Sequence, residues 1–145
     1  MTKYFEVTQG GIYYGKKLVT SGSASPGHLM ALSTGGSVIS QCATTGCPFG
    51  MLTGSRFTYA PTSTDYPTGE TAAVVMGDFL CLISAEYFST GSIPSSPNTP
   101  LYAAAGGVLA TSGTTQVGQF ISSKAVTLPG GSQNVALCRI NLAAA

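Results

Sequence analysis

The sequence predicts an all-β fold: a compact β-barrel or a β-tulip or sandwich with an extended N-terminal arm and little or no helix. Short strand-like runs, glycine-rich turns between them and the absence of helical periodicity predict this class. No segment places apolar residues at i, i+3, i+4 and i+7 over three turns, and the alanine runs 103–105 and 143–145 are too short to form helices. Many short strands separated by glycine turns are typical of sandwiches and barrels.

The expected strands begin close to the N-terminus. Alternating side chains over Tyr4–Thr8 predict the first strand, inside a segment 1–9 that we expect to form the arm. Further strands are expected at Ile12–Thr20, His28–Leu32, Ser37–Gln41, Phe49–Thr53, Ala72–Met76, Phe79–Ser84, Leu101–Ala104, Val108–Ala110, Val117–Ser122 and Asn134–Leu142. Because glycine adopts positive φ at low cost, turns are expected at the glycine pairs 10–11, 35–36, 106–107 and 130–131 and at Gly46, Gly54, Gly69 and Gly113.

The run Ala72–Ile83 is apolar on both faces and is interrupted only by Gly77-Asp78. A strand with two apolar faces must be covered on both sides, so we expect this run at the centre of the fold or in a subunit contact. Gly77-Asp78 is either a two-residue hairpin turn or a bulge in one bent strand, and we favour the bend.

One domain is expected over residues 1–145, with a core at 10–142 and a short tail at 143–145. Two proline-containing segments, 54–69 and 89–100, predict long loops because proline cannot take part fully in a strand ladder. Long ordered loops on a β scaffold are either binding surfaces or plain connections, and both alternatives stay open.

Charged residues make up only 8% of the chain, against about 25% in an ordinary globular domain, and the net charge is +1. Hydrophobic residues make up 43%, which is enough for an independent core and excludes a disordered chain. We therefore expect a folded domain whose polar surface is mostly serine and threonine, and much of whose surface contacts other protein.

Nucleic acid and membrane are not expected as partners. Among the basic residues only Lys16 and Lys17 are adjacent, whereas phosphate binding requires clustered positive charge. No stretch approaches the ~18 consecutive apolar residues of a membrane span. Lys3 is followed by strand-like alternation instead of an apolar signal core, which indicates synthesis in a cytoplasm.

Few residues in the chain can perform catalysis, so we expect no enzyme and no cofactor. His28 is the only imidazole, and a histidine that opens a strand ordinarily satisfies its hydrogen bonds at the surface. The motifs of serine hydrolases and of phosphate-binding loops are absent. A glycosidase pair could still assemble from Glu70, Asp78 and Glu86, although scattered solubilising charge is the favoured interpretation.

The four cysteines do not predict a metal site. Cys42 and Cys47 are five positions apart and lack a second pair at zinc-finger spacing, while Cys81 and Cys138 lie in apolar strands typical of buried thiols. In a reducing compartment all four would stay thiols, and Cys42 and Cys47 could form a disulfide on oxidation.

Aromatic residues give the clearest indication of binding. Adjacent Tyr13 and Tyr14 in a strand place one ring on each face, so at least one ring needs a partner outside the core or a place on the surface. Tyrosine suits interfaces because its ring buries area while its hydroxyl hydrogen-bonds; the alternative is ordinary packing of an N-terminal strand. The candidate partner-binding residues are Tyr4, Phe5, Val7, Tyr13, Tyr14, Tyr59 and Tyr66.

The order of elements over Pro26–Leu32, the Gly-Gly hairpin to Val38, and Pro48–Leu52 resembles the small capsid decoration (cement) proteins of tailed bacteriophages. The resemblance spans most of the chain, from Met1 to Leu142, and is one of composition and element order. The loop 89–100 departs from it, which indicates either an added decoration or a different β family.

The resemblance implies a charge-poor β-barrel or β-tulip, commonly a trimer, on the outer surface of the expanded head. It implies a structural role, in which the protein clamps neighbouring subunits of the major capsid protein and stabilises their contacts. Tyr4–Thr8 would be the arm that adds to a sheet of the shell. Such a protein stabilises the shell because it binds the assembled state and not the disassembled one.

Two other functions remain as alternatives. The chain could be a receptor- or glycan-binding β-module of a fibre or adhesin, with the loops 54–69 and 89–100 as its binding surface; the absence of tryptophan and the few acids weaken this alternative, while Tyr59 and Tyr66 support it. A degenerate hydrolase is the more remote alternative, since the chain lacks an evident catalytic base.

Overall fold

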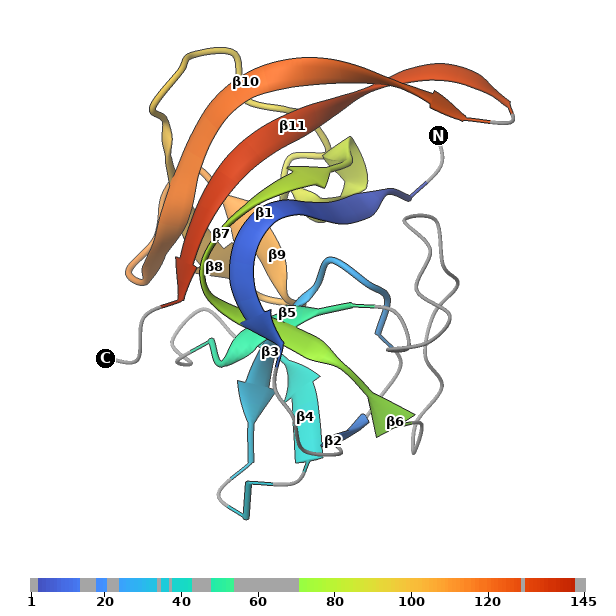
Figure 1. Ribbon diagram of the computed structural model, residues 1–145. Coiled ribbons are helices and arrows are strands. Elements are labelled where there is room, and N and C mark those ends of the chain that lie inside the picture. Colours follow the sequence, from blue (N-terminus) through green and yellow to red (C-terminus); the bar gives the residue numbers. More distant parts are fainter. Residues whose placement is uncertain are drawn as a thin grey trace.

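Eleven strands form one hydrogen-bonded sheet in the computed structural model, which describes residues 3–13, 18–20, 24–33, 35–36, 38–42, 48–53, 71–128 and 130–142 (Figure 1). The strands are β1 (Phe5–Tyr13), β2 (Leu18–Thr20), β3 (Leu29–Leu32), β4 (Val38–Gln41), β5 (Gly50–Leu52), β6 (Thr71–Ala72), β7 (Val74–Ile83), β8 (Pro100–Ala104), β9 (Val108–Ala110), β10 (Gln116–Leu128) and β11 (Gly131–Leu142). The described helical structure is one 3-10 turn, η1 (Ala85–Tyr87). The prediction of an all-β fold is confirmed.

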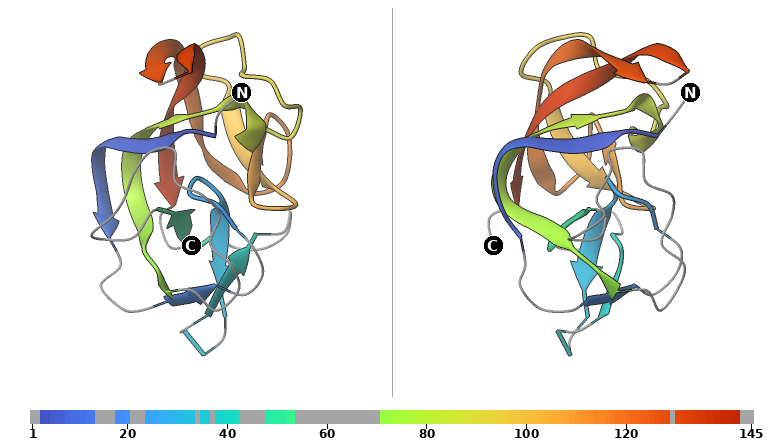
Figure 2. Two further views of the ribbon diagram at one scale, coloured as in Figure 1. Left: turned by 90° about the vertical axis from the view of Figure 1, so that its right-hand side faces the viewer. Right: turned by 45° about the vertical axis from the view of Figure 1, so that its right-hand side comes forward.

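The strand order is β6-β2-β4-β3-β5-β7-β11-β10-β8-β9, and β1 pairs with β7 as a branch. All of these pairings are antiparallel except that of β2 with β4. Because the order ends at β6 and at β9, the sheet is not closed into a barrel in the described part of the chain. Of the architectures expected, the barrel is therefore corrected to an open, strongly curled sheet (Figures 1 and 2).

The apolar run of the sequence forms the long central strand β7, which pairs with β1, β5 and β11. Pairing with β11 continues without interruption through Gly77 and Asp78, whereas the β1 register skips there: Gly10 faces Phe79 and Ile12 faces Met76. Two residues of β7 thus oppose Gly11 alone, which defines a bulge. The favoured prediction of a bend, as opposed to a hairpin turn, is confirmed.

Gly10-Gly11 was expected to be a turn and instead lies inside β1, which bends together with β7 (Figure 2). Both glycines have positive φ, 77° and 82°. A Cβ on Gly10 would lie 2.8 Å from the carbonyl oxygen of Asp78, and one on Gly11 would lie 2.6 Å from Cγ2 of Val75. The bend therefore requires glycine at both positions.

The described part of the segment expected to form the N-terminal arm belongs to the sheet. Phe5 pairs with Ile83 and is fully buried. Just before it, the amide of Tyr4 donates to Oγ of Ser84 at 2.9 Å, and the amide of Ser84 donates back to the carbonyl of Tyr4 at 3.0 Å. The first residues of β1 are therefore attached to the end of β7.

Two apolar clusters lie on opposite faces of the layer made by β3, β5 and the start of β7. The main cluster contains Leu29, Met51 and Val75, and the second contains their chain neighbours Met30, Leu52 and Val74. Successive side chains of a strand point to opposite faces, so one short layer contributes to both clusters. The two apolar faces predicted from the sequence are thereby accounted for.

The loop 89–100 packs against the sheet. The amide of Asn98 donates to the carbonyl of Phe120 and the amide of Phe120 donates to that of Thr99, at 2.8 and 2.9 Å. Ile93 packs on the main apolar cluster. The other long loop expected, 54–69, lies outside the described residues.

The hairpin of β10 and β11 projects beyond the rest of the sheet (Figures 1 and 2). β8 pairs with β10 only as far as Gln119, and β7 pairs with β11 only from Ala136 onward. Residues 124–128 and 131–135 therefore pair only with each other among the residues described. None of the described residues forms a helix long and apolar enough to span a membrane.

Substitution of Gly11 by alanine should destabilise the fold, because it combines an unfavourable φ with a clash against Val75. We expect a loss of about 1–3 kcal/mol in the free energy of unfolding, measured by urea denaturation. Gly35→Ala is the matched control, since no described atom lies within 4 Å of the position that its Cβ would take, and should change stability by no more than about 0.5 kcal/mol. Equal effects of the two substitutions would contradict this account of the bend.

Alkaline pH should weaken the attachment of β1. Burial, together with the hydrogen bond that the Tyr4 hydroxyl donates to Glu6 and the charge of Glu6, raises the pKa of Tyr4 from 10.0 to about 12. Between these two values the unfolded chain has released the phenolic proton while the folded chain keeps it, so stability falls as the pH rises. Denaturant titrations at pH 9 to 12 should show this decline, and Tyr4→Phe should make it shallower; an unchanged slope in the variant would disprove the assignment.

Candidate functional site

The N-terminal residues expected to bind a partner divide into buried and exposed groups. Phe5 is fully buried and Tyr4 is only 8% exposed, while Val7 is half-buried against the main apolar cluster. The side chains of Tyr4 and Phe5 therefore belong to the core of the chain. Bulges shift the register of β1, so its early residues face inward and its last residues face solvent.

Ile12 and Tyr13 are the large hydrophobic residues exposed in the described part of the chain, at 66% and 50%. They end β1, opposite Met76 and Val75. The sequence indicated Tyr13, and Ile12 was overlooked because it was treated as the start of a new strand after a turn. The remaining candidates, Tyr14, Tyr59 and Tyr66, lie outside the described residues.

Among the described strands β1 pairs only with β7, so no described strand pairs with its other edge. An open edge offers backbone N–H and C=O groups to a further strand. Register shifts between Val7 and Gln9 and between Gly10 and Ile12 interrupt that edge. The edge and the Ile12–Tyr13 pair together form a surface suited to protein contact, which we call the β1 edge surface.

His28 lies in a hydrogen-bonded cluster with Ser25 and Tyr87 that the sequence did not reveal. The amide of Ser25 donates to Nδ1 of His28 at 3.0 Å, and the rings of His28 and Tyr87 meet edge to face with centroids 5.1 Å apart. Oγ of Ser25, which is fully buried, accepts from the hydroxyl of Tyr87 at 3.3 Å and from Nζ of Lys3 at 3.4 Å.

This geometry is that of a turn before a strand and not of a nucleophile with its base. The lone pair of Nδ1 already accepts the Ser25 amide, so it is not available to take the proton of the Ser25 hydroxyl, 3.4 Å away. The hydroxyl itself is shielded from solvent. The cluster satisfies buried polar groups, so His28 makes its hydrogen bonds in a partly buried position and not at the surface that was expected.

The acidic residues do not form a facing pair in the described structure. Asp78 lies on the outward face at the bend of β7 and forms an ion pair with Arg139, which holds the pKa of Asp78 below its usual value. Glu86 lies beyond the other end of β7, where it accepts from Oγ of Ser84 at 3.2 Å. Glu70 is outside the described residues.

Three cysteines are described, and all three are buried thiols. Cys81 and Cys138 face each other across β7 and β11, and burial raises the pKa of both, to about 12 for Cys138. Cys42 is buried, and Cys47 lies outside the described residues, so their possible disulfide remains a prediction. Within the described ranges no three His, Cys, Asp or Glu side chains gather to hold a metal.

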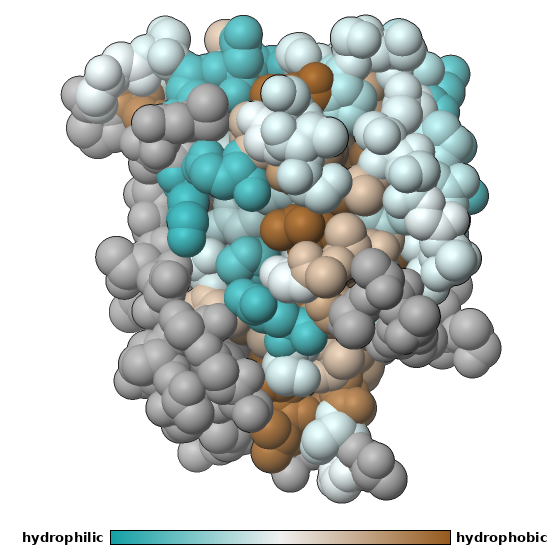
Figure 3. All heavy atoms as spheres, turned by 180° about the vertical axis from the view of Figure 1, so that it is seen from behind, coloured by the Kyte–Doolittle hydropathy of each residue, from teal (hydrophilic) through white to brown (hydrophobic). Residues whose placement is uncertain are grey.

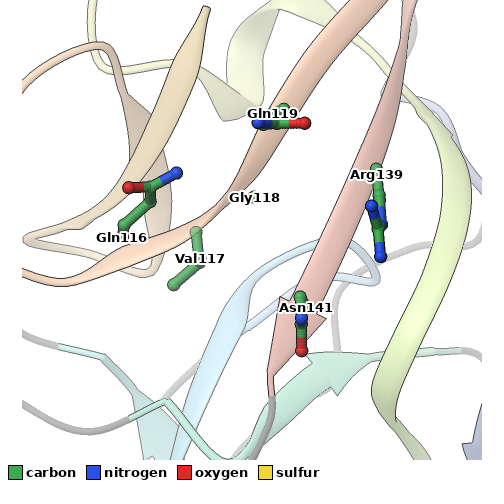
Figure 4. Close-up of a pocket in the computed structure, with 6 residues that line it drawn as sticks. All are labelled: Gln116, Val117, Gly118, Gln119, Arg139 and Asn141. Carbon is green, nitrogen blue, oxygen red and sulfur yellow. The ribbon is translucent and has the colours of Figure 1, made fainter. Parts of the chain in front are cut away.

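A polar hollow of about 380 Å³ lies over β10 and β11 (Figure 4). Its lining comprises Gln116, Val117, Gly118, Gln119, Arg139 and Asn141. The sequence analysis did not single out these residues, because the register that brings them together depends on bulges in β10. The described surface thus offers two places for binding, the β1 edge surface and this hollow.

In comparisons with known proteins, no family model and no curated protein sequence matches the chain. A solved structure of the N base of the head fiber protein gp8.5 of bacteriophage phi29 is similar to it. The similarity has a TM-score of 0.50 and 14% sequence identity, and covers 92% of this chain and 96% of that chain. At this identity the likeness shows a shared fold, and the chain has the fold of a phage head-fiber base over nearly its whole length.

Proposed function

We propose that the chain is a non-enzymatic structural protein of a phage virion, which binds the outer surface of the assembled head. The fold shared with a head-fiber base over 92% of the chain is the observation that carries this proposal. The expectation of a capsid decoration protein points to the same location, and the major capsid protein is the proposed partner.

The β1 edge surface is the proposed contact with the capsid. It combines a strand edge to which no described strand pairs with the exposed side chains Ile12 and Tyr13. Apolar and aromatic side chains at the centre of an interface contribute most of the binding energy, and backbone pairing fixes orientation. Each contact can be modest, because many copies on one shell and a trimer that spans several subunits would act together.

The weakly charged surface supports a role in protein contact. On the face shown in Figure 3, weakly polar residues in pale shades predominate over the upper part of the molecule. With 8% charged residues in the chain, long-range steering by charge contributes little. Head binding is therefore expected to depend only slightly on salt concentration.

A second candidate function within this proposal is that of a head-fibre base. It is favoured because the similar solved structure is the N base of a head fiber protein. A base would hold a protruding fibre at the head, whereas a decoration protein would stabilise the shell directly. The two are distinguished by heating heads with and without bound protein: a decoration protein raises the temperature at which the shell opens, and a base leaves it nearly unchanged.

Purified chain should co-sediment saturably with expanded heads of the phage that encodes it, prepared without the protein. Ile12→Lys and Tyr13→Ser should each weaken this binding at least about tenfold, because each removes an exposed apolar anchor. Ser112→Lys, in the turn between β9 and β10, is the control and should bind like the original chain. Absence of saturable binding, with the chain folded, would overturn the proposed function; unchanged binding of both β1 variants would overturn only the contact.

A further inference from the structure

The polar hollow over β10 and β11 is separate from the β1 edge surface, since β11 and β7 lie between β10 and β1 in the sheet. It is open to solvent on the outward face of the sheet, while the opposite face packs on the main apolar cluster through Phe120, Cys138 and Ile140. Its volume of about 380 Å³ falls within the ~300–1,000 Å³ of small-ligand sites.

The backbone of β10 shapes the hollow through two irregularities. Register shifts place one extra residue, Val117, against β8 and another, Ile121, against β11. Between them, Gly118 lies so close to β11 that a Cβ would overlap the carbonyl oxygen of Arg139. Bulges re-aim side chains next to functional sites, and here they present Gln116 and Gln119 at the same opening.

Among the hydrogen-bonding side chains of the hollow, Arg139 is held in place by an ion pair. Arg139 donates through Nε and Nη2 to the two carboxylate oxygens of Asp78, at 3.1 and 2.7 Å, so the planar guanidinium is held in one orientation. Gln119 pairs with Arg139 across the strands, and Asn141 pairs with Asp78. Arg139 and Asn141 follow one another along β11, with Gln119 on the neighbouring strand (Figure 4).

The charge and polarity of these groups restrict the class of ligand. The carboxylate of Asp78 neutralises Arg139, so the site does not favour an anion, and one carboxylate already bound to arginine does not form a cation site. Four of the six lining residues carry polar side chains that can hydrogen-bond a ligand. The three amides offer both donors and acceptors, the guanidinium offers donors, and Asp78 compensates its charge, a combination that matches the hydroxyl groups of a sugar.

We infer that the hollow over β10 and β11 is a binding site for a neutral saccharide, with Gln119, Arg139 and Asn141 as its main hydrogen-bonding residues. No aromatic ring lines the described hollow, so a single site should bind weakly, with Kd on the order of 1 mM. If the chain is displayed in many copies on a head, as proposed above, avidity would make such weak sites effective.

Titration of the full chain with maltose and with N,N′-diacetylchitobiose, each to tens of millimolar, tests the inference directly. The readout is the backbone amide NMR chemical shifts. For at least one of the two sugars, saturable shifts should be confined to β10, β11 and the bend of β7. Gln119→Ala and Asn141→Ala should each weaken that binding roughly three- to tenfold, the loss expected for one hydrogen-bonding group. Gln133→Ala is the matched control, a glutamine on β11 outside the hollow, and should leave the affinity unchanged.

Spectra of each variant report at once whether the fold is retained, so a lost site is distinguished from an unfolded chain. The inference would be overturned by the absence of a saturable shift with either sugar or by shifts centred outside the hollow. It would also be overturned if Gln119→Ala and Asn141→Ala bound the sugar with the affinity of the original chain. Preferential binding of sulfate, titrated in parallel, would also overturn it, because it would identify an anion site at Arg139. The experiment uses no heads, so its failure leaves the proposed head binding untouched.

Discussion

The bend shared by β1 and β7 is the constraint on which the rest of the structure depends. Gly10 and Gly11 on one strand face the bulge at Gly77-Asp78 on the other. The backbone of Asp78 leaves no space for a Cβ at Gly10, and the side chain of Val75 leaves none at Gly11. Because β7 is bent there, its first residues pair with β5 and the remainder with β11. One continuous strand thereby connects the part of the sheet around β3 and β5 with the part around β10 and β11.

This connection also explains how a small chain supports two apolar clusters. Val74 and Val75 are consecutive and fully buried, yet they belong to different clusters, because successive side chains of β7 point to opposite faces. The neighbouring strands repeat this arrangement. Burial of apolar surface on both faces of one layer contributes stability without a metal or a disulfide among the described residues.

The same bulges that bend the sheet define its surface. On β1 they interrupt an open edge and turn Ile12 and Tyr13 outward, which limits uncontrolled strand pairing while leaving a short segment for a specific partner. On β10 they open the polar hollow beside Arg139. In the interior, the buried hydroxyl of Ser25 is hydrogen-bonded to Tyr87 and Lys3.

The sequence by itself determined the fold class and the central strand. Strand-like alternation and glycine spacing are local properties, so they predicted most strands, and the two-faced apolar run Ala72–Ile83 predicted a central strand bent at Gly77-Asp78. It also indicated Tyr13 as a surface residue. In contrast, the sequence Gly10-Gly11 is typical of a turn. Glycine is favoured wherever the backbone adopts positive φ, which occurs in a bulge as well as in a turn.

Only the tertiary structure decided which residues of β1 are buried and which neighbours share a site. Tyr4 and Phe5 enter the core because β1 pairs with a strand about seventy residues away, with a register set by bulges at both strands. Asp78 meets Arg139 because β7 pairs with β11, about sixty residues away, and Gln119 lies beside Arg139 through a register that a bulge in β10 shifts. Such contacts depend on strand order and register, which are set by long-range packing and leave no periodic signal in the chain.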